Sequence, residues 1–274
     1  MNKAKLSPGA KIYMALILIF LYAPIAVMAV FSFNSSAGTY VFTGFSTKWW
    51  SEMFHNSAAM GALKNTLLLA VCNALTATVI GTMAAVGIYN YRNKHLKSVV
   101  MTVTNIPMMN PEIVTGISMM LLFVFAAGIE GLSWHALNFW SLLIAHITFS
   151  LPYVVLNVLP KLKQFDINVY EAAVDLGCKP VKAFFKVVLP NITTGIITGL
   201  VMSFTLSLDD FIISYFTNGP SFQTLPIYIF SLTKKRVKPD MYALSTLMFL
   251  VVLVLLILMN IAQSKAEKRK GEGR

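Results

Sequence analysis

Three acidic residues lie in or beside long apolar stretches of this 274-residue chain, where carboxylates are rare. Glu112 directly follows Asn110-Pro111, and Asp209 and Asp210 stand at the end of a charge-free run. An ionisable side chain at membrane depth costs about 2.5–3.5 kcal/mol on insertion scales, so it usually faces a cavity and marks the route of a substrate. A carboxylate there stabilises an ammonium group and repels an anion. These three residues are therefore candidates for a cation path.

Each acid also has a purely structural interpretation. Asp209 and Asp210 can cap the end of a helix at the outer interface, and neighbours on a helix point about 100° apart, so at most one is expected to face a central path directly. Glu112 can be a structural residue beside Pro111, which lacks an N–H and is expected to open the helix and free its carbonyls. The sequence leaves both interpretations open.

Other chemistry finds little support among the residues. The apolar runs contain no metal-spaced histidine pair and no nucleophile–base pair, and His135 and His146 are interpreted as packing or interfacial residues. Cys72 and Cys178 support no disulfide framework. The sequence lacks the Gly-x-x-x-x-Gly-Lys-[Ser/Thr] motif that cradles ATP phosphates, and it lacks any Gly-Lys dipeptide. We therefore expect no catalytic residue, no metal and no cofactor in this chain.

The composition requires a membrane protein. Hydrophobic residues make up 57% of the chain, charged residues only 12%, and the mean hydropathy is +0.69, whereas about 25% of the residues of a soluble domain are charged. The apolar runs are long enough for helices that cross a bilayer, and they lack the period-two alternation of a barrel. The first run is too long for a signal peptide, so we expect an uncleaved helix there.

We therefore predict a single transmembrane domain over residues 1–274, an all-α integral membrane protein with six transmembrane helices. The expected spans are about 12–33, 65–90, 98–128, 136–160, 191–213 and 241–264.

The basic residues orient these helices. With the N-terminus inside, sixteen of the 22 Lys and Arg residues lie in inner segments, which satisfies the positive-inside rule and places both termini in the cytoplasm. Topology and contact with anionic membrane lipid thus explain most of the net charge of +11, and nucleic acid is not expected as a partner.

One alternative topology is a near tie. If residues 211–233 formed a seventh span, fifteen basic residues would lie inside. The turn signal Asn218-Gly219-Pro220 and the second breaker Pro226 favour a re-entrant or outer loop instead. A seventh span would place the basic cluster Lys234–Lys238 inside, whereas in the six-span topology it lies outside and has no explanation.

The outer loop from Asn34 to Ala62 is expected to contain a short amphipathic element at the membrane surface. Its aromatic residues are Phe42, Phe45, Trp49, Trp50 and Phe54. In one interpretation they form an aromatic belt that anchors the protein. In the other, an indole, for which we take Trp49, faces the entrance of the substrate path.

Residues 161–190 are too polar for lipid and are patterned as two short helices. Asn168 and Glu171 have the spacing of a capping box, and the helix they begin should end near Gly177. Pro180 suits the first turn of a second helix, which should end at Pro190. The pair predicts a docking element for a cytosolic partner. A DNA-binding helix-turn-helix is a poor alternative between two membrane spans.

The same segment resembles a known family. Glu171-Ala172-Ala173, three residues, Gly177, nine residues and Val187-Val188-Leu189-Pro190 resemble the EAA signature of the membrane subunits of ABC importers, with Val where Ile is usual. Four further blocks are similar to the spermidine/putrescine branch of these permeases and its PotC-type subunits: Phe33–Ser36, Phe45–Trp49, Asn110–Val114 and Ser203–Asp210. The resemblance extends over nearly the whole chain and is most specific in the EAA segment.

The resemblance implies a type I ABC importer (MetI-like) permease fold in which residues 161–190 form a cytosolic EAA-type coupling loop. In that family the loop rests in a groove of an ATPase, which implies a coupling role for Glu171, Ala172, Ala173, Gly177, Leu189 and Pro190. The implied partners are a second, PotB-type permease, a PotA-type ATPase dimer that binds ATP and Mg, and an extracytoplasmic PotD-type polyamine-binding protein.

The function that follows from this resemblance is the ATP-driven import of polyamines, spermidine and/or putrescine, through a bacterial inner membrane. Two alternatives stay open. An ABC permease can carry another amine, an amino acid or iron. An ion-coupled secondary transporter would also use intramembrane acids, although it needs no docking loop and no internal repeat is evident.

Overall fold

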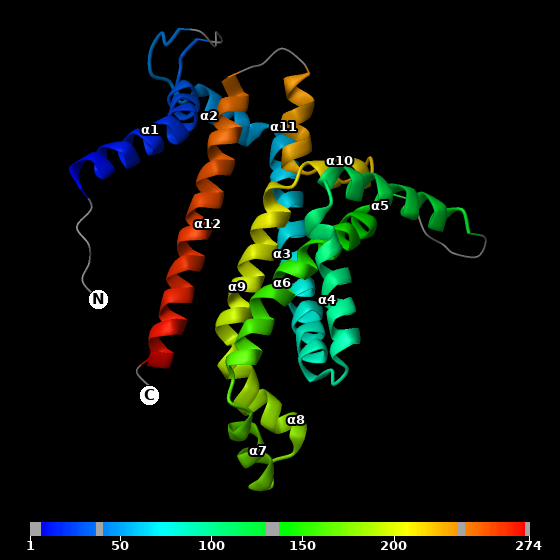
Figure 1. Cartoon of the computed structure of the whole chain (residues 1–274). Coiled ribbons are helices and arrows are strands. Elements are labelled where there is room, and N and C mark those ends of the chain that lie inside the picture. Colours follow the sequence, from blue (N-terminus) through cyan, green and yellow to red (C-terminus); the bar gives the residue numbers. More distant parts are fainter. Residues whose placement is uncertain (1–6, 37–40, 130–136, 235–238, 272–274) are drawn as a thin grey trace. The chain divides into compact units, whose positions relative to one another are not determined.

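The computed structural model describes residues 7–36, 41–129, 137–234 and 239–271, and the regular elements in these ranges are helices (Figure 1). His135 and Lys235–Lys238 lie outside the described residues. The elements are α1 (Pro8–Phe31), α2 (Lys48–His55), α3 (Ser57–Asn90), α4 (Lys94–Met109), α5 (Glu112–Ala127), α6 (Phe139–Gln164), α7 (Ile167–Asp175), α8 (Pro180–Ala183), the π-helical segment η1 (Phe184–Val188), α9 (Leu189–Asp209), α10 (Ile212–Thr217), α11 (Leu225–Thr233) and α12 (Pro239–Gly271). The all-α class is confirmed.

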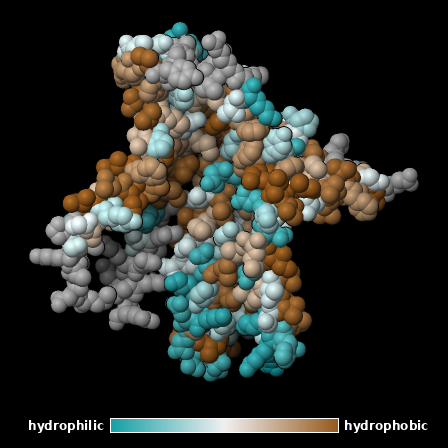
Figure 2. Space-filling view, turned by 45° about the horizontal axis from the view of Figure 1, so that its top comes forward, coloured by the Kyte–Doolittle hydropathy of each residue, from teal (hydrophilic) through white to brown (hydrophobic). Residues whose placement is uncertain are grey.

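Five helices in the described ranges are long and apolar enough to cross a membrane, and the number is six if the bent pair α4–α5 counts as one span. These five helical stretches are Gly9–Phe31, Ser57–Asn90, Phe139–Gln164, Pro180–Asp209 and Asp240–Leu258. Figure 2 shows extended hydrophobic areas beside hydrophilic ones on the visible face, as expected for a protein of which part faces lipid.

The chain divides into two compact units. The first contains residues 1–60 and 229–251. Its helix α1 is capped by Ser7, whose hydroxyl accepts a hydrogen bond from the Ala10 N–H. The chain after α1 folds around the buried side chain of Asn34, which donates to the Val41 carbonyl and accepts from the Thr43 N–H, both at 2.9 Å.

The second unit contains residues 61–228 and 252–274, and its core lies where α3, α6 and α9 pack together. Small residues allow this close approach: a Cβ at Gly195 would lie 2.6 Å from the carbonyl oxygen of Asn157, and one at Gly81 would lie 2.7 Å from Val154. Close packing of backbones through small residues is the usual way in which helices associate in lipid.

The expected third span is bent. Helix α4 ends at Met109, α5 begins at Glu112, and their axes differ by 105° across Asn110-Pro111. This bend confirms the predicted opening of the helix at Pro111. Its cause is that proline cannot donate a backbone hydrogen bond and that its ring clashes with the preceding turn.

Residues 211–233 contain two short helices, α10 and α11, in place of one long helix. The chain between them includes Asn218-Gly219-Pro220, the turn signal identified in the sequence. Among the described residues, this stretch is not one of the helices able to cross a membrane.

Two details of the loop 161–190 differ from the prediction. The cap of α7 is Asp166, whose side chain accepts from the Asn168 N–H at 3.0 Å, so the proposed capping box of Asn168 and Glu171 is wrong. Asp and Asn cap a helix equally well. The cap at Asp166 makes α7 two residues longer at its start than predicted, and Tyr170 packs against the core of α3 and α6.

The second difference concerns Pro190, which does not end a helix. It lies in the first turn of α9, and the helical path continues into it from α8 through η1. The Leu189 N–H bonds to the Phe184 carbonyl, five residues back. A π-helical turn of this kind widens the backbone and leaves room for a proline ring.

Candidate functional site

Two breaks in the helical framework of the second unit carry the three acids. Glu112 is the first residue of α5, directly after the bend at Asn110-Pro111. Asp209 is the last residue of α9, and Asp210 lies in the extended link that leads to α10. Both breaks open onto one cavity of about 620 Å³.

All three carboxylates line this cavity, which is the main finding about the predicted path residues. The lining residues, all within the described part of the chain, include no lysine, arginine or histidine. They are Pro107, Met108, Asn110, Pro111, Glu112, Thr115, Phe149, Tyr153, Leu206, Asp209, Asp210, Phe211, Ile212 and Ile213. An acidic cavity without basic residues in its lining attracts cations and repels anions.

The acids have different surroundings. Glu112 and Asp209 are exposed to solvent in this chain, whereas the side chain of Asp210 is only 6% exposed. Asp210 accepts hydrogen bonds from the N–H groups of Ser214 (2.7 Å) and Ile213 (3.3 Å), so it caps the start of α10. Capping is therefore a real role of Asp210, and Asp209 is the more accessible of the pair.

Glu112 also has a structural contribution. It occupies the first turn of α5, where the N-terminal end of the helix dipole stabilises a negative charge. This position leaves its carboxylate among the cavity residues, so the structural and the cation-binding interpretations of Glu112 are compatible.

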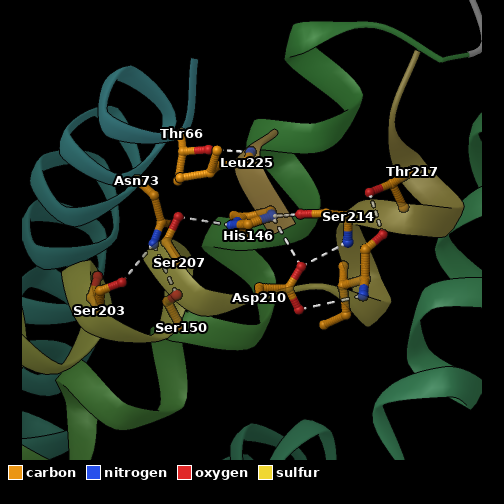
Figure 3. A network of polar contacts seen from close by, with 11 residues as sticks. Thr66, Asn73, His146, Ser150, Ser203, Ser207, Asp210, Ser214, Thr217 and Leu225 are labelled. Atoms are coloured by element: carbon orange, nitrogen blue, oxygen red, sulfur yellow. Dashed lines mark hydrogen bonds and ion pairs between the residues drawn. The ribbon is translucent and has the colours of Figure 1, made fainter. Parts of the chain in front are cut away.

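The sequence analysis missed the aromatic and polar part of the cavity lining. Phe149 and Tyr153 come from α6 and Phe211 from the α9–α10 link. The faces of such rings attract ammonium groups. A sequence signal existed, because His146, Phe149 and Tyr153 recur at the spacing of one helix face. His146 itself is fully buried and is hydrogen-bonded to Ser207 and Ser214 (Figure 3).

Trp49 belongs to the first unit and is not among the cavity residues. It is the second residue of α2 and is buried, with 9% of its surface exposed. Its indole N–H donates to the Asn34 carbonyl at 2.7 Å. The ring thus joins two blocks that the sequence analysis had singled out, Phe33–Ser36 and Phe45–Trp49.

The six residues of the EAA pattern lie on a loop with exposed apolar side chains. Glu171, Ala172 and Ala173 are on α7, Gly177 ends that helix with a positive φ of 85°, and Leu189 and Pro190 begin α9. The most exposed apolar side chains on the loop are those of Leu176 (88%), Val181 (70%) and Phe185 (59%). Exposed apolar side chains are typical of a protein-binding surface where they lie together in one patch.

Comparison with known proteins identifies relatives of the whole chain. Residues 77–271 match the family described as binding-protein-dependent transport system inner membrane component. The spermidine/putrescine transport system permease protein PotC of Escherichia coli K12 is 40% identical over 261 residues, which cover 95% of this chain and 96% of the relative. The putrescine transport system permease protein PotI of the same strain is 36% identical over 268 residues, 96% of this chain and 94% of the relative.

Solved structures share the fold. A bacterial ABC transporter involved in the import of the acidic polysaccharide alginate superposes with a TM-score of 0.73 at 17% identity, covering 93% of this chain and 92% of that chain. The MetNI methionine ABC transporter superposes with a TM-score of 0.62 at 16% identity, over 81% of this chain and 99% of that chain. These similarities support the MetI-like permease fold expected from the sequence.

Proposed function

This chain belongs to the family of binding-protein-dependent transport system inner membrane components, and we propose that as a multi-pass permease it imports polyamines, spermidine and/or putrescine. The observation that carries the proposal is the cavity into which two helix breaks bring Glu112, Asp209 and Asp210. A linear polyamine carries two or more ammonium groups, and each can pair with a carboxylate while its methylene segments contact Phe149 and Tyr153.

The same cavity argues against an anionic cargo. The structural neighbour named for alginate import has the same fold at only 17% identity, and three carboxylates in one cavity would repel a polyanion. Another cationic solute is the remaining competitor. Uptake assays with spermidine, putrescine, a basic amino acid and a neutral amino acid distinguish these cargoes.

The test of the cation path uses neutral isosteres of the cavity acids. In cells that contain the assembled transporter and no other polyamine uptake system, Glu112→Gln and Asp209→Asn should raise the half-saturating polyamine concentration about tenfold or more, because a charge-assisted hydrogen bond is worth about 1.5–3 kcal/mol. Glu52→Gln is the matched control, since Glu52 is exposed on α2 and pairs with Lys48. Unchanged uptake by both cavity variants would show that the acids do not contact the cargo.

We further propose that the chain works in a complex driven by ATP. Its partners are a second permease of the PotB type, a PotA-type ATPase dimer that binds ATP and Mg, and an extracytoplasmic PotD-type binding protein that delivers the polyamine. The loop from α7 to α9 transmits closure of the ATPase through Glu171, Ala172, Ala173, Gly177, Leu189 and Pro190. The exposed apolar side chains of this loop support that role.

The coupling role has its own test. Glu171→Ala should abolish uptake while the amount of protein in the membrane stays normal, and Asp175→Ala, an exposed acid on the same helix, should have little effect. If Glu171→Ala transports at the normal rate, the loop does not couple through this residue.

The proposed topology has six spans with α4–α5 as one of them and both termini in the cytoplasm of a bacterium. A reporter enzyme fused after Arg274 that is active only in the cytoplasm should be active. Trp49 is proposed as a further residue of the substrate path, and its substitution would then reduce uptake of every polyamine alike.

A further inference from the structure

His146 joins the two sides of the break that carries Asp209 and Asp210 (Figure 3). Its Nδ1 is hydrogen-bonded to the Ser207 hydroxyl at 2.8 Å, and its Nε2 to the Ser214 hydroxyl at 3.0 Å. Ser207 is on α9 before the break and Ser214 is on α10 after it. One imidazole ring from α6 therefore holds both helices, and its Nε2 also lies 3.5 Å from Asp210 Oδ2.

The ring is placed on a rigid base. His146 is fully buried, and α6 packs closely on α9 where a Cβ at Gly199 would lie 3.2 Å from Val154. Ser150 follows His146 by one helical turn on α6. Asn73 of α3 donates hydrogen bonds to the Ser150 hydroxyl and to the Ser203 carbonyl on α9, both at 3.0 Å. The imidazole thus has a fixed position from which it sets that of α10.

Helix α10 in turn supports the other break. A Cβ at Gly116 of α5 would lie 3.0 Å from Phe216 and 3.5 Å from the Ile212 carbonyl oxygen, so α5 rests directly on α10. Glu112 is one turn away from Gly116, at the start of α5. Any shift of α10 relative to α9 therefore moves Glu112 relative to Asp209.

We propose that His146 is a positioning residue for polyamine transport: it clamps α9 to α10 through Ser207 and Ser214 and so fixes the spacing of the three cavity carboxylates. This inference rests on the proposed function of the cavity as a cation path. Spacing matters because the ammonium groups of a linear polyamine are separated by methylene chains of fixed length, and a carboxylate displaced by an ångström pairs poorly. His146 does not line the cavity and acts only through its neighbours.

The test removes one arm of the clamp at a time. Ser207→Ala and Ser214→Ala each delete a hydroxyl and leave the imidazole in place, which avoids the hole that His146→Ala would leave. Ser203→Ala is the matched control: it deletes a buried hydroxyl one turn earlier on α9 that has no hydrogen-bond partner among the described residues. His146→Ala and the double variant Ser207→Ala/Ser214→Ala complete the series.

We expect each arm variant to raise the half-saturating polyamine concentration about three- to tenfold, as for one lost buried hydrogen bond, and to change the ratio of spermidine to putrescine uptake. The maximal rate per transporter should change less. Ser203→Ala should match the unmodified protein, and the double variant should be no worse than His146→Ala, because both remove the same clamp. A role in stability alone would lower the amount of protein and leave the half-saturating concentration and the cargo ratio unchanged.

A second measurement does not depend on the cargo. In a protein with Cys72→Ala and Cys178→Ala, the further substitution Phe211→Cys on the break provides a thiol that is labelled with a small cationic reagent. Its labelling rate should change several-fold in Ser214→Ala and stay constant in Ser203→Ala. Equal labelling and equal half-saturating concentrations in all serine variants would overturn the clamp. A third outcome is that Ser214→Ala changes the labelling rate but not the half-saturating polyamine concentration, while Glu112→Gln also leaves uptake unchanged. In that case the proposed cargo is wrong, and the role of His146 in positioning α10 is retained.

Discussion

Replacing Gly177 by valine should reduce transport about five- to thirtyfold because of the conformation that the backbone adopts at this position. Gly177 has a φ of 85°, and it ends α7 with two hydrogen bonds, from its own N–H to the Val174 carbonyl (2.9 Å) and from the Cys178 N–H to the Ala173 carbonyl (3.1 Å). This is the Schellman arrangement that favours glycine. A Cβ here would meet no atom within 4 Å, so the cost of substitution is conformational and not steric.

The magnitude follows from that distinction. A left-handed conformation costs an L-residue about 1–2 kcal/mol. The loop conformation seen here should therefore lose about five- to thirtyfold in population against alternatives with a negative φ at residue 177. Asparagine tolerates this conformation better than other residues, so the expected order of activity is Gly, then Asn, then Ala, then Val.

The assay is polyamine-stimulated ATP hydrolysis and uptake by the complete transporter in proteoliposomes, with the amount of each variant measured by immunoblot. Gly87→Ala is the control, because Gly87 lies in α3 without a positive φ and a Cβ there would also meet nothing within 4 Å. Coupled activity of Gly177→Val equal to that of the unmodified protein would refute the reasoning, since it would mean that the end of α7 is not needed in this conformation.

Three further changes test the packing and the helix ends. Gly195→Val should lower the thermal midpoint of the purified protein, since overpacking costs about 1–3 kcal/mol and a Cβ there would lie 2.6 Å from the Asn157 carbonyl oxygen; an unchanged midpoint would show that α6 and α9 can separate freely. Trp49→Phe removes the 2.7 Å hydrogen bond to the carbonyl of buried Asn34 and should lower the free energy of unfolding by about 1–3 kcal/mol. The measurement is the rate of proteolysis between residues 41 and 47, which should rise, and Phe54→Leu is the control at an exposed side chain. Asp166→Ala should lower the stability of α7 by about 1 kcal/mol and reduce polyamine-stimulated ATP hydrolysis, because it removes the helix cap. Asn168→Ala should change neither quantity. An effect of Asn168→Ala alone would show that Asn168 is the cap.

Features that depend on one residue and its near neighbours were predictable. Pro111 lacks an N–H wherever it stands, so the opening of the helix before Glu112 could be predicted from the sequence. Gly177 was identified as a helix end for the same kind of reason, since glycine is the residue that adopts a positive φ without strain. The apolar runs predicted helices because no other spanning structure that fits their pattern satisfies the backbone in lipid.

Where two local solutions have similar free energy, the sequence was not enough. Asp166 and Asn168 can both cap a helix, and the packing of Tyr170 against the core accompanies the earlier start. Pro190 ends a regular α-helix, yet the π-helical turn before it lets the helical path continue into α9. Such choices are made by packing against other helices, whose positions a local pattern does not contain.

By itself the sequence determined that this protein is a helical membrane protein, that Glu112, Asp209 and Asp210 stand in or beside its long apolar runs, and that residues 161–190 carry a pattern of the EAA type. Only the tertiary structure decided that those three acids share one cavity with Phe149 and Tyr153, and that His146 bonds both sides of the break beside them. The physical reason is one of range. Hydrophobicity, charge and backbone restriction act at each residue, whereas a cavity exists only after helices distant in the sequence have packed together.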